Sequence, residues 1–263
     1  MDSMDINLTF YERELGNHRA WLGAAGPRRV ERWELLLRND WEAAIVEALA
    51  REFLQSEVPG TRPFDDPESG GPDLVCHHPE GHFYVEVTCL RESTVTNQTE
   101  LPPHGGQGGF YGTLTRSILT KCVNKTRQCG NLDAPCLLLI GTLHGQGAEV
   151  CFDRFHVEDV LLGEGMITAP FDPEVGETGD IRETRNVEKA AFIKGDAGKG
   201  NLFGPARRSI SGLLLCGFSR RKPDVLGVLH PCPARAFDPS LLPNVTFGRV
   251  VETAGGSKQV EWR

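Results

Sequence analysis

A chain of 263 residues, with 39% hydrophobic and 24% charged residues, has the composition of an ordinary soluble globular protein and can bury a proper core. It contains no run of about 18 apolar residues, which excludes a membrane span. The net charge of −8 disfavours a general polyanion binder, although a local basic patch is compatible with it. The acidic start, "MDSMDINLTFYEREL", lacks the pattern of a signal peptide, and we expect a cytoplasmic protein.

The eight cysteines form no C-x-x-C pair, and most of them lie in apolar segments such as "LVCH", "VTCL" and "LLLCGF". Free cysteine packs there as a small hydrophobe, so we expect reduced thiols rather than a disulfide scaffold. Cys76 stands near His77, His78 and His82, but this spacing matches no closed four-ligand zinc set.

The N-terminal part of the chain is predicted to be helical. Residues 8–38 carry apolar positions on both sides of a "GAAGP" break. The segment "DWEAAIVEALAREFL" follows, with Asp40 as a capping residue and apolar side chains at helical spacing. A turn-rich stretch, "PGTRPFDDPESGGP", ends this part of the chain.

A β-hairpin is predicted next, because "DLVC" and "HFYVEVTCL" are joined by the turn-like "HHPEG". Residues 97–112 are rich in glycine and are predicted to be a loop. Residues 113–129 are expected to form a helix, and "PCLLLIGTL" a buried strand.

The second half of the chain is less regular in pattern. Residues 163–206 look like a loop, but a structureless loop of that length is unusual, so the segment is either a lid or contains short strands. "SISGLLLCGF" and "DVLGVLHP" then predict two more strands. This order of elements predicts one α/β domain, with a mixed central sheet flanked by helices.

Two carboxylates interrupt the predicted hairpin. Side chains alternate along "HFYVEVTCL", so Glu86 shares a face with Tyr84, Thr88 and Leu90. Both faces are mostly apolar, and a charged Glu86 is costly there unless a cation or a hydrogen-bond network compensates it. Asp73 begins the neighbouring strand and would lie close to Glu86. Two converging carboxylates form a hard-cation site, typical of Mg²⁺.

Pro72-Asp73 followed by Glu86-Val87-Thr88 resembles the motif of the PD-(D/E)xK nuclease superfamily, over roughly residues 40 to 143. The resemblance implies a restriction-endonuclease-like core, with a helix before the hairpin that carries a third acidic residue. Glu42 in "WEAAIVEAL" is the best match for that residue, and Glu47 on the same helix is the runner-up.

The chain departs from this motif at Thr88, where the family has a lysine. On the helix 113–129, Lys125 occupies a gap in an apolar stripe and should therefore point toward the sheet, with Lys121 beside it. Members of the superfamily are known in which the lysine has moved to this helix. The sequence "KTRQ" at 125–128 is similar to their K-x-x-Q arrangement, which includes Gln128.

The chemistry that the resemblance implies is metal-assisted phosphodiester hydrolysis, with DNA favoured as substrate. Asp73, Glu86 and the carbonyl of Val87 would hold Mg²⁺, with Mn²⁺ as an alternative, and Glu42 would hold the ion through water or help a second ion. Lys125 would orient the attacking water, and Gln128 would fix the lysine or a phosphate oxygen.

Plainer interpretations stand beside each of these assignments. Glu86 could lie on an edge strand in solvent, and Asp73 could be an ordinary turn residue. Glu42 could serve the dipole of its own helix, and Lys121 and Lys125 could lie on a solvated helix face. Basic groups at Arg28–Arg29, Arg207–Arg208 and 220–222 would form a phosphate-tracking rim only if they converge on the acidic site.

The expected organisation is an N-terminal helical segment over residues 1–39, a nuclease-like core over 40–145, and an extension over 146–263 that completes or decorates the same domain. The alternative function is an inactive member of the same fold that binds nucleic acid or a protein partner. A homodimer and a structural subunit of a larger assembly also remain open, and no membrane partner is expected.

Overall fold

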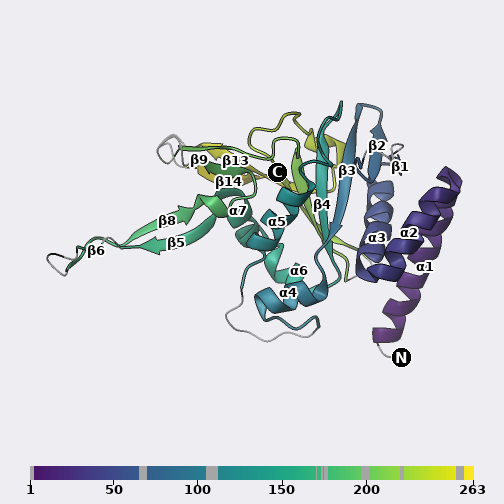
Figure 1. Ribbon diagram of the computed structural model, residues 1–263, viewed down its shortest axis with the longest axis horizontal. Coiled ribbons are helices and arrows are strands. Elements are labelled where there is room, and N and C mark those ends of the chain that lie inside the picture. Colours follow the sequence, from purple (N-terminus) through teal and green to yellow (C-terminus); the bar gives the residue numbers. More distant parts are fainter. Residues whose placement is uncertain are drawn as a thin grey trace.

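The computed structural model describes residues 3–64, 70–104, 112–169, 171–172, 174, 177–196, 202–219, 222–252 and 258–263. It confirms the predicted α/β class, because a large mixed sheet runs through the molecule with helices on both of its faces (Figure 1).

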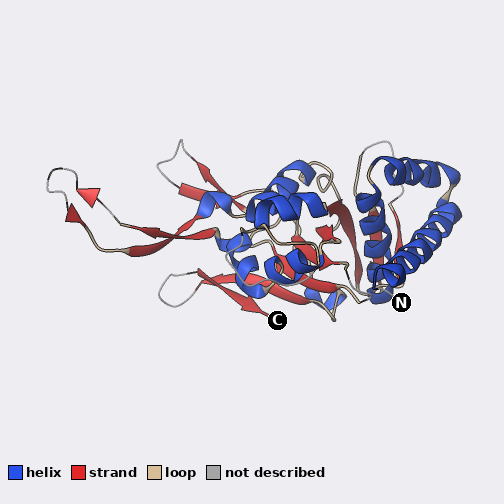
Figure 2. Ribbon diagram, turned by 90° about the horizontal axis from the view of Figure 1, so that it is seen from below, coloured by secondary structure: helices blue, strands red, loops and turns tan. Residues whose placement is uncertain are grey.

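Three helices precede the sheet: α1 (Ser3–Ala25), α2 (Pro27–Asn39) and α3 (Trp41–Glu57). The expected break separates α1 from α2 at Gly26, whose φ of 136° is accessible to glycine, and Pro27 follows at the first helical position. Asp40 caps α3, as predicted, by accepting a hydrogen bond of 3.3 Å from the Ala43 N–H. The tight connections hold α1 and α2 together as a pair that packs on α3 (Figure 2).

The central sheet has eight strands in the order β1-β2-β3-β4-β11-β12-β13-β14. Their bounds are β1 (Gly60–Pro63), β2 (Leu74–His78), β3 (Gly81–Cys89), β4 (Cys136–Thr142), β11 (Gly212–Gly217), β12 (Asp224–Leu229), β13 (Thr246–Glu252) and β14 (Lys258–Trp262). The pairs β3–β4, β4–β11 and β12–β13 are parallel, and the others are antiparallel. The predicted hairpin, the buried strand and the two later strands are confirmed as β2–β3, β4, β11 and β12. Strands from both halves of the chain thus form one sheet.

The two faces of the sheet are covered by different helices. One face packs against α3, and its core includes Phe83, Val85 and Val87 of β3. The other face packs against α5 (Thr115–Lys125), α6 (Gly145–Cys151) and α7 (Arg154–Leu162), and its core includes Tyr84 and Leu90. The predicted alternation along β3 is therefore confirmed, and so is the prediction that both faces of this strand are covered.

Two predicted boundaries are wrong. The expected loop over 97–112 begins inside a helix, because α4 (Glu92–Thr99) extends to Thr99, while residues 105–111 of that loop lie outside the described part of the chain. The helix expected over 113–129 ends at Lys125, and residues 126–129 form a turn.

The segment over 163–206 contains short strands, which was one of its two expected forms. Strand β5 (Glu164–Thr168) pairs with β8 (Arg182–Asn186), and β6 (Phe171–Asp172) pairs with β7 (Glu177–Thr178), so that this arm projects from the body of the molecule (Figure 1). Strand β9 (Ile193–Asp196) pairs with β10 (Leu202–Pro205), and short 3-10 helices occur at Val187–Lys189 and Pro239–Leu241.

All eight cysteines are free thiols, and only Cys232 is exposed, which confirms the expectation that they pack as small hydrophobes. Among the described helices, none has the length and apolar character needed to cross a membrane.

Candidate metal and nucleic-acid site

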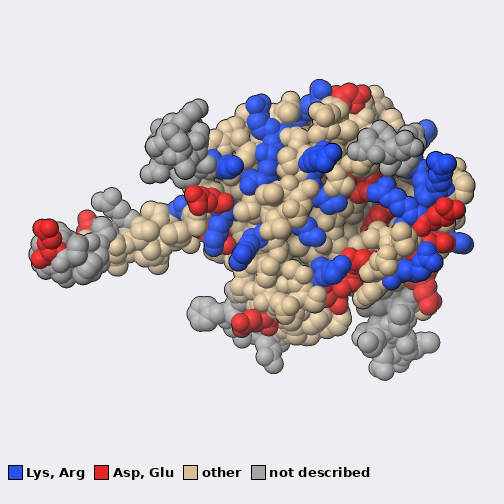
Figure 3. Space-filling model, viewed as in Figure 1, with Lys and Arg blue, Asp and Glu red and all other residues tan. Residues whose placement is uncertain are grey.

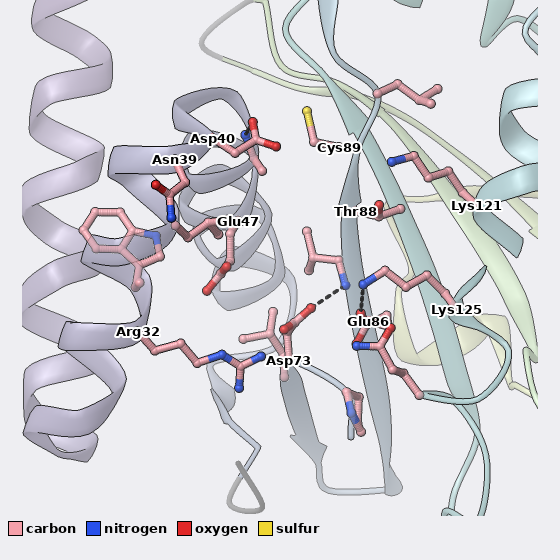
Figure 4. Close-up of a pocket in the computed structure, with 18 of the residues that line it drawn as sticks. Arg32, Asn39, Asp40, Glu47, Asp73, Glu86, Thr88, Cys89, Lys121 and Lys125 are labelled. Carbon is pink, nitrogen blue, oxygen red and sulfur yellow. Dashed lines mark hydrogen bonds and ion pairs between the residues drawn. The ribbon is translucent and has the colours of Figure 1, made fainter. Parts of the chain in front are cut away.

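The site begins where β3 continues past the start of β2. The register pairs Leu74 with Val85, so residues 86–89 of β3 have no neighbour on β2. Asp73, just before β2, fills the first position of this open edge. Its Oδ2 accepts a hydrogen bond of 2.8 Å from the Val87 N–H (Figure 4). The Asp73 carboxylate thus takes the place of a strand partner for the Val87 N–H. Because Val87 directly follows Glu86, this hydrogen bond also holds Asp73 next to Glu86.

The Val87 carbonyl shares that edge. In a strand, the N–H and C=O groups of one residue point to the same neighbour. Because the Val87 N–H points to Asp73, its carbonyl oxygen is directed to the same side. The backbone therefore presents an oxygen beside the carboxylates, as the proposed ligand set requires.

Glu86 projects from β3 to the opposite side, toward α5, and its side chain is only 1% exposed. One of its oxygens, Oε1, accepts a hydrogen bond of 2.6 Å from the Nζ of Lys125 (Figure 4). The other oxygen, Oε2, is buried without a hydrogen-bond partner among the described residues. A buried carboxylate oxygen in this state is costly, and it is available to a ligand such as a metal ion.

Lys125 is the last residue of α5, and its side chain is 26% exposed. The apolar stripe of Leu114, Ile118 and Cys122 is buried against the sheet, which turns Lys125 inward as its place in the stripe predicts. Thr88 lies beside Glu86 on β3, with only 9% exposure, and no lysine is present there. The cation that contacts Glu86 therefore comes from the helix rather than from the strand.

Lys121 and Gln128 also face this region and line the same cleft. Lys121 stands about one helical turn before Lys125, and Figure 4 shows its amino group beside Thr88 and Cys89. Burial, assisted by the charges of Lys125 and Arg91, lowers the pKa of Lys121. Lys121 thus provides a second partly buried cation.

The carboxyl groups of the site resist ionisation. Burial, and then the charge of Glu86, raise the pKa of Asp73. Burial also raises the pKa of Glu86, although the ammonium of Lys125 opposes this effect. Both shifts disfavour the ionised carboxylates, so a further cation would favour the ionised pair.

The third acidic residue at the site is Glu47 rather than Glu42. Glu47 projects from α3 into the cleft (Figure 4), and its charge raises the pKa of both Asp73 and Glu86. Glu42 does not line the cleft. Its Oε2 accepts a hydrogen bond of 2.7 Å from the Glu92 N–H at the start of α4. Five residues on a helix correspond to a rotation of roughly 140°, so the two side chains cannot share a face.

The sequence favoured Glu42, whereas Glu47 is the one of the two that lines the cleft, and a signal for Glu47 exists in the sequence. The α3 residues Ala44, Ile45, Val46 and Ala48 around it are buried, and an acid inside such a run needs a reason to be there. Glu47 has a buried neighbour of its own, because the His18 Nε2 lies 3.5 Å from its Oε1.

The oxygen atoms present fit a magnesium ion bound in part by its substrate. Among the described residues, no group of three or more His, Cys, Asp or Glu side chains forms a ready metal cage. Mg²⁺ does not need one, since it commonly uses one or two carboxylates together with water and substrate phosphates. Here Asp73 and the Oε2 of Glu86 supply the two carboxylates, and the Val87 carbonyl adds one backbone oxygen.

The acidic residues lie in a cleft of about 1010 Å³ between the N-terminal helices and the sheet with α5. Its described lining contains seven cationic side chains against four carboxylates. The cations are Arg28, Arg29, Arg32, Arg91, Arg116, Lys121 and Lys125, and the carboxylates are Asp40, Glu47, Asp73 and Glu86. Lys and Arg side chains are frequent on the face of the molecule drawn in Figure 3, across α5 and the N-terminal helices. The cleft is locally basic in a chain of net charge −8.

Of the described residues in the basic groups noted in the sequence, only Arg28 and Arg29 line this cleft. Arg207 and Arg208 instead donate hydrogen bonds to backbone carbonyls elsewhere. Residues 220–221 lie outside the described part of the chain. Sequence reasoning did not single out Arg32, which extends from α2 toward Asp73 in Figure 4.

No family model, curated protein or solved structure matches the chain.

Proposed function

We propose that the protein is a metal-dependent nuclease that hydrolyses phosphodiester bonds of nucleic acid. The observation that carries the proposal is the contact between Lys125 and Glu86 beside Asp73. It joins two neighbouring carboxylates, Glu86 buried and Asp73 half-buried, to a cation at the floor of a basic cleft, and the Oε2 of Glu86 has no hydrogen-bond partner among the described residues. A structural ion pair would need neither the second carboxylate nor the basic walls.

Asp73, Glu86 and the Val87 carbonyl would hold Mg²⁺ or Mn²⁺ in this proposal, with Glu47 taking the assisting role first given to Glu42. A bound divalent ion polarises a phosphate and lowers the pKa of the water that attacks it. The raised pKa values of Asp73 and Glu86 support this assignment, because burial disfavours the ionised carboxylates and a bound cation would favour them.

The lysines act on the other side of the reacting phosphate. Lys125 stays within reach of both Glu86 and the cleft, so it orients the attacking water and offsets the negative charge of the transition state. Gln128, from the turn after α5, holds Lys125 or a phosphate oxygen. Lys121 adds positive charge close to Thr88. Thr88 and Lys125 line the same cleft.

The order of elements supports the resemblance on which DNA is favoured as substrate. Helix α3 precedes the β2–β3 hairpin, α5 follows it with Lys125, and β4 then pairs in parallel with β3. The resemblance implies this order of elements for a restriction-endonuclease-like core, and the elements bring Asp73, Glu86 and Lys125 to one place.

A cleavage assay on plasmid, linear duplex, single-stranded DNA and RNA tests the proposal, with Mg²⁺, Mn²⁺ or EDTA. Metal-dependent cleavage that is lost in Glu86→Gln is the expected result. Glu86→Gln retains the size of the side chain and removes its charge, and Glu80→Gln, on the exposed hairpin turn, is the matched control. Wild-type protein that cuts none of these substrates with either metal would refute the proposal.

One observation favours a non-catalytic alternative. Lys125 already compensates Glu86, and the basic walls of the cleft could bind phosphates without any metal. A module of this kind would bind nucleic acid equally well in EDTA, and its binding would not change in Asp73→Asn.

A further inference from the structure

The cleft has two basic walls that face each other across an acidic floor. Helix α2 contributes Arg28 and Arg32 to one wall, and α5 contributes Arg116 and Lys121 to the other. Glu86 belongs to the floor and is only 1% exposed. A phosphate that reaches Glu86 must therefore pass between the two walls rather than lie across a flat surface.

Four cations of the two walls lack a carboxylate partner among the described residues. Arg91 pairs with Asp40 at 2.6 Å, and Lys125 pairs with Glu86. Within the described residues, Arg28, Arg32, Arg116 and Lys121 have no carboxylate at ion-pair distance. These four positive charges, two on each wall, can therefore bind the backbone of a nucleic acid from two sides.

The α1–α2 side of the cleft also presents apolar surface. Trp21, Leu35 and Leu36 line it next to Arg32, and Leu35 is 53% exposed. A phosphate backbone gains little binding free energy from an apolar surface. Unstacked bases gain more, because their flat faces can pack against apolar and aromatic side chains. In a duplex the flat faces of the bases are stacked on each other and are closed to this wall.

The volume of the cleft is suited to a single strand of nucleic acid. Its volume of about 1010 Å³ lies near the upper end of the roughly 300–1,000 Å³ typical of pockets for small molecules. Such a space accommodates a few nucleotides of an unpaired strand.

We infer that the substrate bound in this cleft is an unpaired strand of nucleic acid, with its phosphates between the arginines of α2 and the basic side chains of α5, and its bases against Trp21 and Leu35. This inference rests on the proposed nuclease function and specifies its substrate. The N-terminal helical pair thereby becomes a wall of the substrate site.

Fluorescence anisotropy in EDTA, where no metal-dependent cleavage occurs, tests the inference directly. The probes are a labelled single-stranded oligonucleotide and the matching blunt duplex. The oligonucleotide has about 12 nucleotides, which is within the usual range of single-strand site sizes. We expect the single strand to bind the wild type at least about tenfold more tightly than the duplex. Arg28→Ala/Arg32→Ala should weaken single-strand binding and reduce its logarithmic salt slope by about 1.4, since each phosphate contact contributes about 0.7.

Arg38→Ala is the matched control, because Arg38 is an exposed arginine in the last turn of α2 that does not line the cleft. Leu35→Ser tests the apolar wall at an exposed position, and it should weaken single-strand binding without changing the salt slope.

The outcomes separate this inference from the proposed function. Equal or tighter duplex binding, or single-strand binding that Arg28→Ala/Arg32→Ala leaves unchanged, would overturn the inference. Metal-dependent cleavage of a duplex would survive that result. Single-strand preference that depends on these arginines, without cleavage of any substrate, would support the strand-binding site and refute the nuclease.

Discussion

Lys125 donates a hydrogen bond of 2.6 Å to Glu86, which stands 39 positions earlier in the chain. This contact joins the end of α5 to the middle of β3, and it gives a nearly inaccessible carboxylate its cation. It also accounts for Thr88, because the positive charge expected at that position arrives from a different element.

Breaking this ion pair from one side should destabilise the fold. Lys125→Met leaves Glu86 buried without its cation, and we expect a loss of about 1–3 kcal/mol in the free energy of unfolding. Glu86→Gln/Lys125→Met should recover most of that loss, since neither charge is then left alone. Urea unfolding of the two single variants and the double variant measures the coupling. Lys121→Met is the control on the same helix, and purely additive effects would contradict the ion pair.

Glu47 and Glu42 should have different roles. Glu47→Gln should reduce cleavage and the apparent Mg²⁺ affinity by about 10–100-fold, as expected for a residue that assists a metal site. Glu42→Gln should instead cost about 1 kcal/mol of stability, because its carboxylate accepts the first N–H of α4. Cleavage rates measured over a Mg²⁺ titration distinguish the two, and a larger catalytic loss in Glu42→Gln would reverse the assignment.

The acidic pair makes stability depend on pH in a defined direction. Because the pKa of Asp73 is raised in the folded protein, the folded state keeps a proton that the unfolded chain has released. The free energy of unfolding therefore falls as pH rises above the ordinary pKa of an aspartate, about 3.9. Asp73→Asn should flatten this decline. Added Mg²⁺ should reduce the fall in the free energy of unfolding in the wild type but not in Asp73→Asn. Thermal unfolding at several pH values, with and without Mg²⁺, measures both effects.

A second pH dependence should arise between α1 and α3. Burial, and then Glu14, raise the pKa of Glu52 to about 7. The stability that its protonated form contributes is thus lost as pH rises from the ordinary glutamate value toward about 7. Glu52→Gln should remove this loss of stability with rising pH. Glu57→Gln, on the same helix, should leave the loss unchanged. Identical profiles of stability against pH for Glu52→Gln and the wild type would show that the folded protein does not hold Glu52 in its protonated form.

Local patterns predicted the parts of the site that lie on regular elements. Glu86 was recognisable as an acid in an apolar strand, and Lys125 as a lysine within an apolar stripe, because both depend on periodicity. Periodicity also identified the hairpin and β4. By contrast, β13 and β14 were not predicted, and their place in the central sheet depends on the parallel pairing of β13 with β12, which lies in a different part of the chain.

The walls of the cleft could not be predicted in this way. Arg28 and Arg32 lie on a helix whose exposed face has the pattern of any solvated surface. Their position opposite α5 results from the packing of α2 on α3, which the sequence does not encode locally. Glu42 was preferred to Glu47 because Leu49 stands about two turns after it, as in the family pattern, whereas the buried neighbours of Glu47 mark the face that the structure turns to the cleft.

The most direct test of the account returns the lysine to the strand. Lys125→Ala should abolish metal-dependent cleavage, and Thr88→Lys added to it should restore a measurable part, because residue 88 shares a face with Glu86 and lines the same cleft. Single-turnover cleavage by the wild type, Lys125→Ala and Thr88→Lys/Lys125→Ala measures this. Cleavage by Lys125→Ala at the wild-type rate would contradict the claim that Lys125 supplies the catalytic cation.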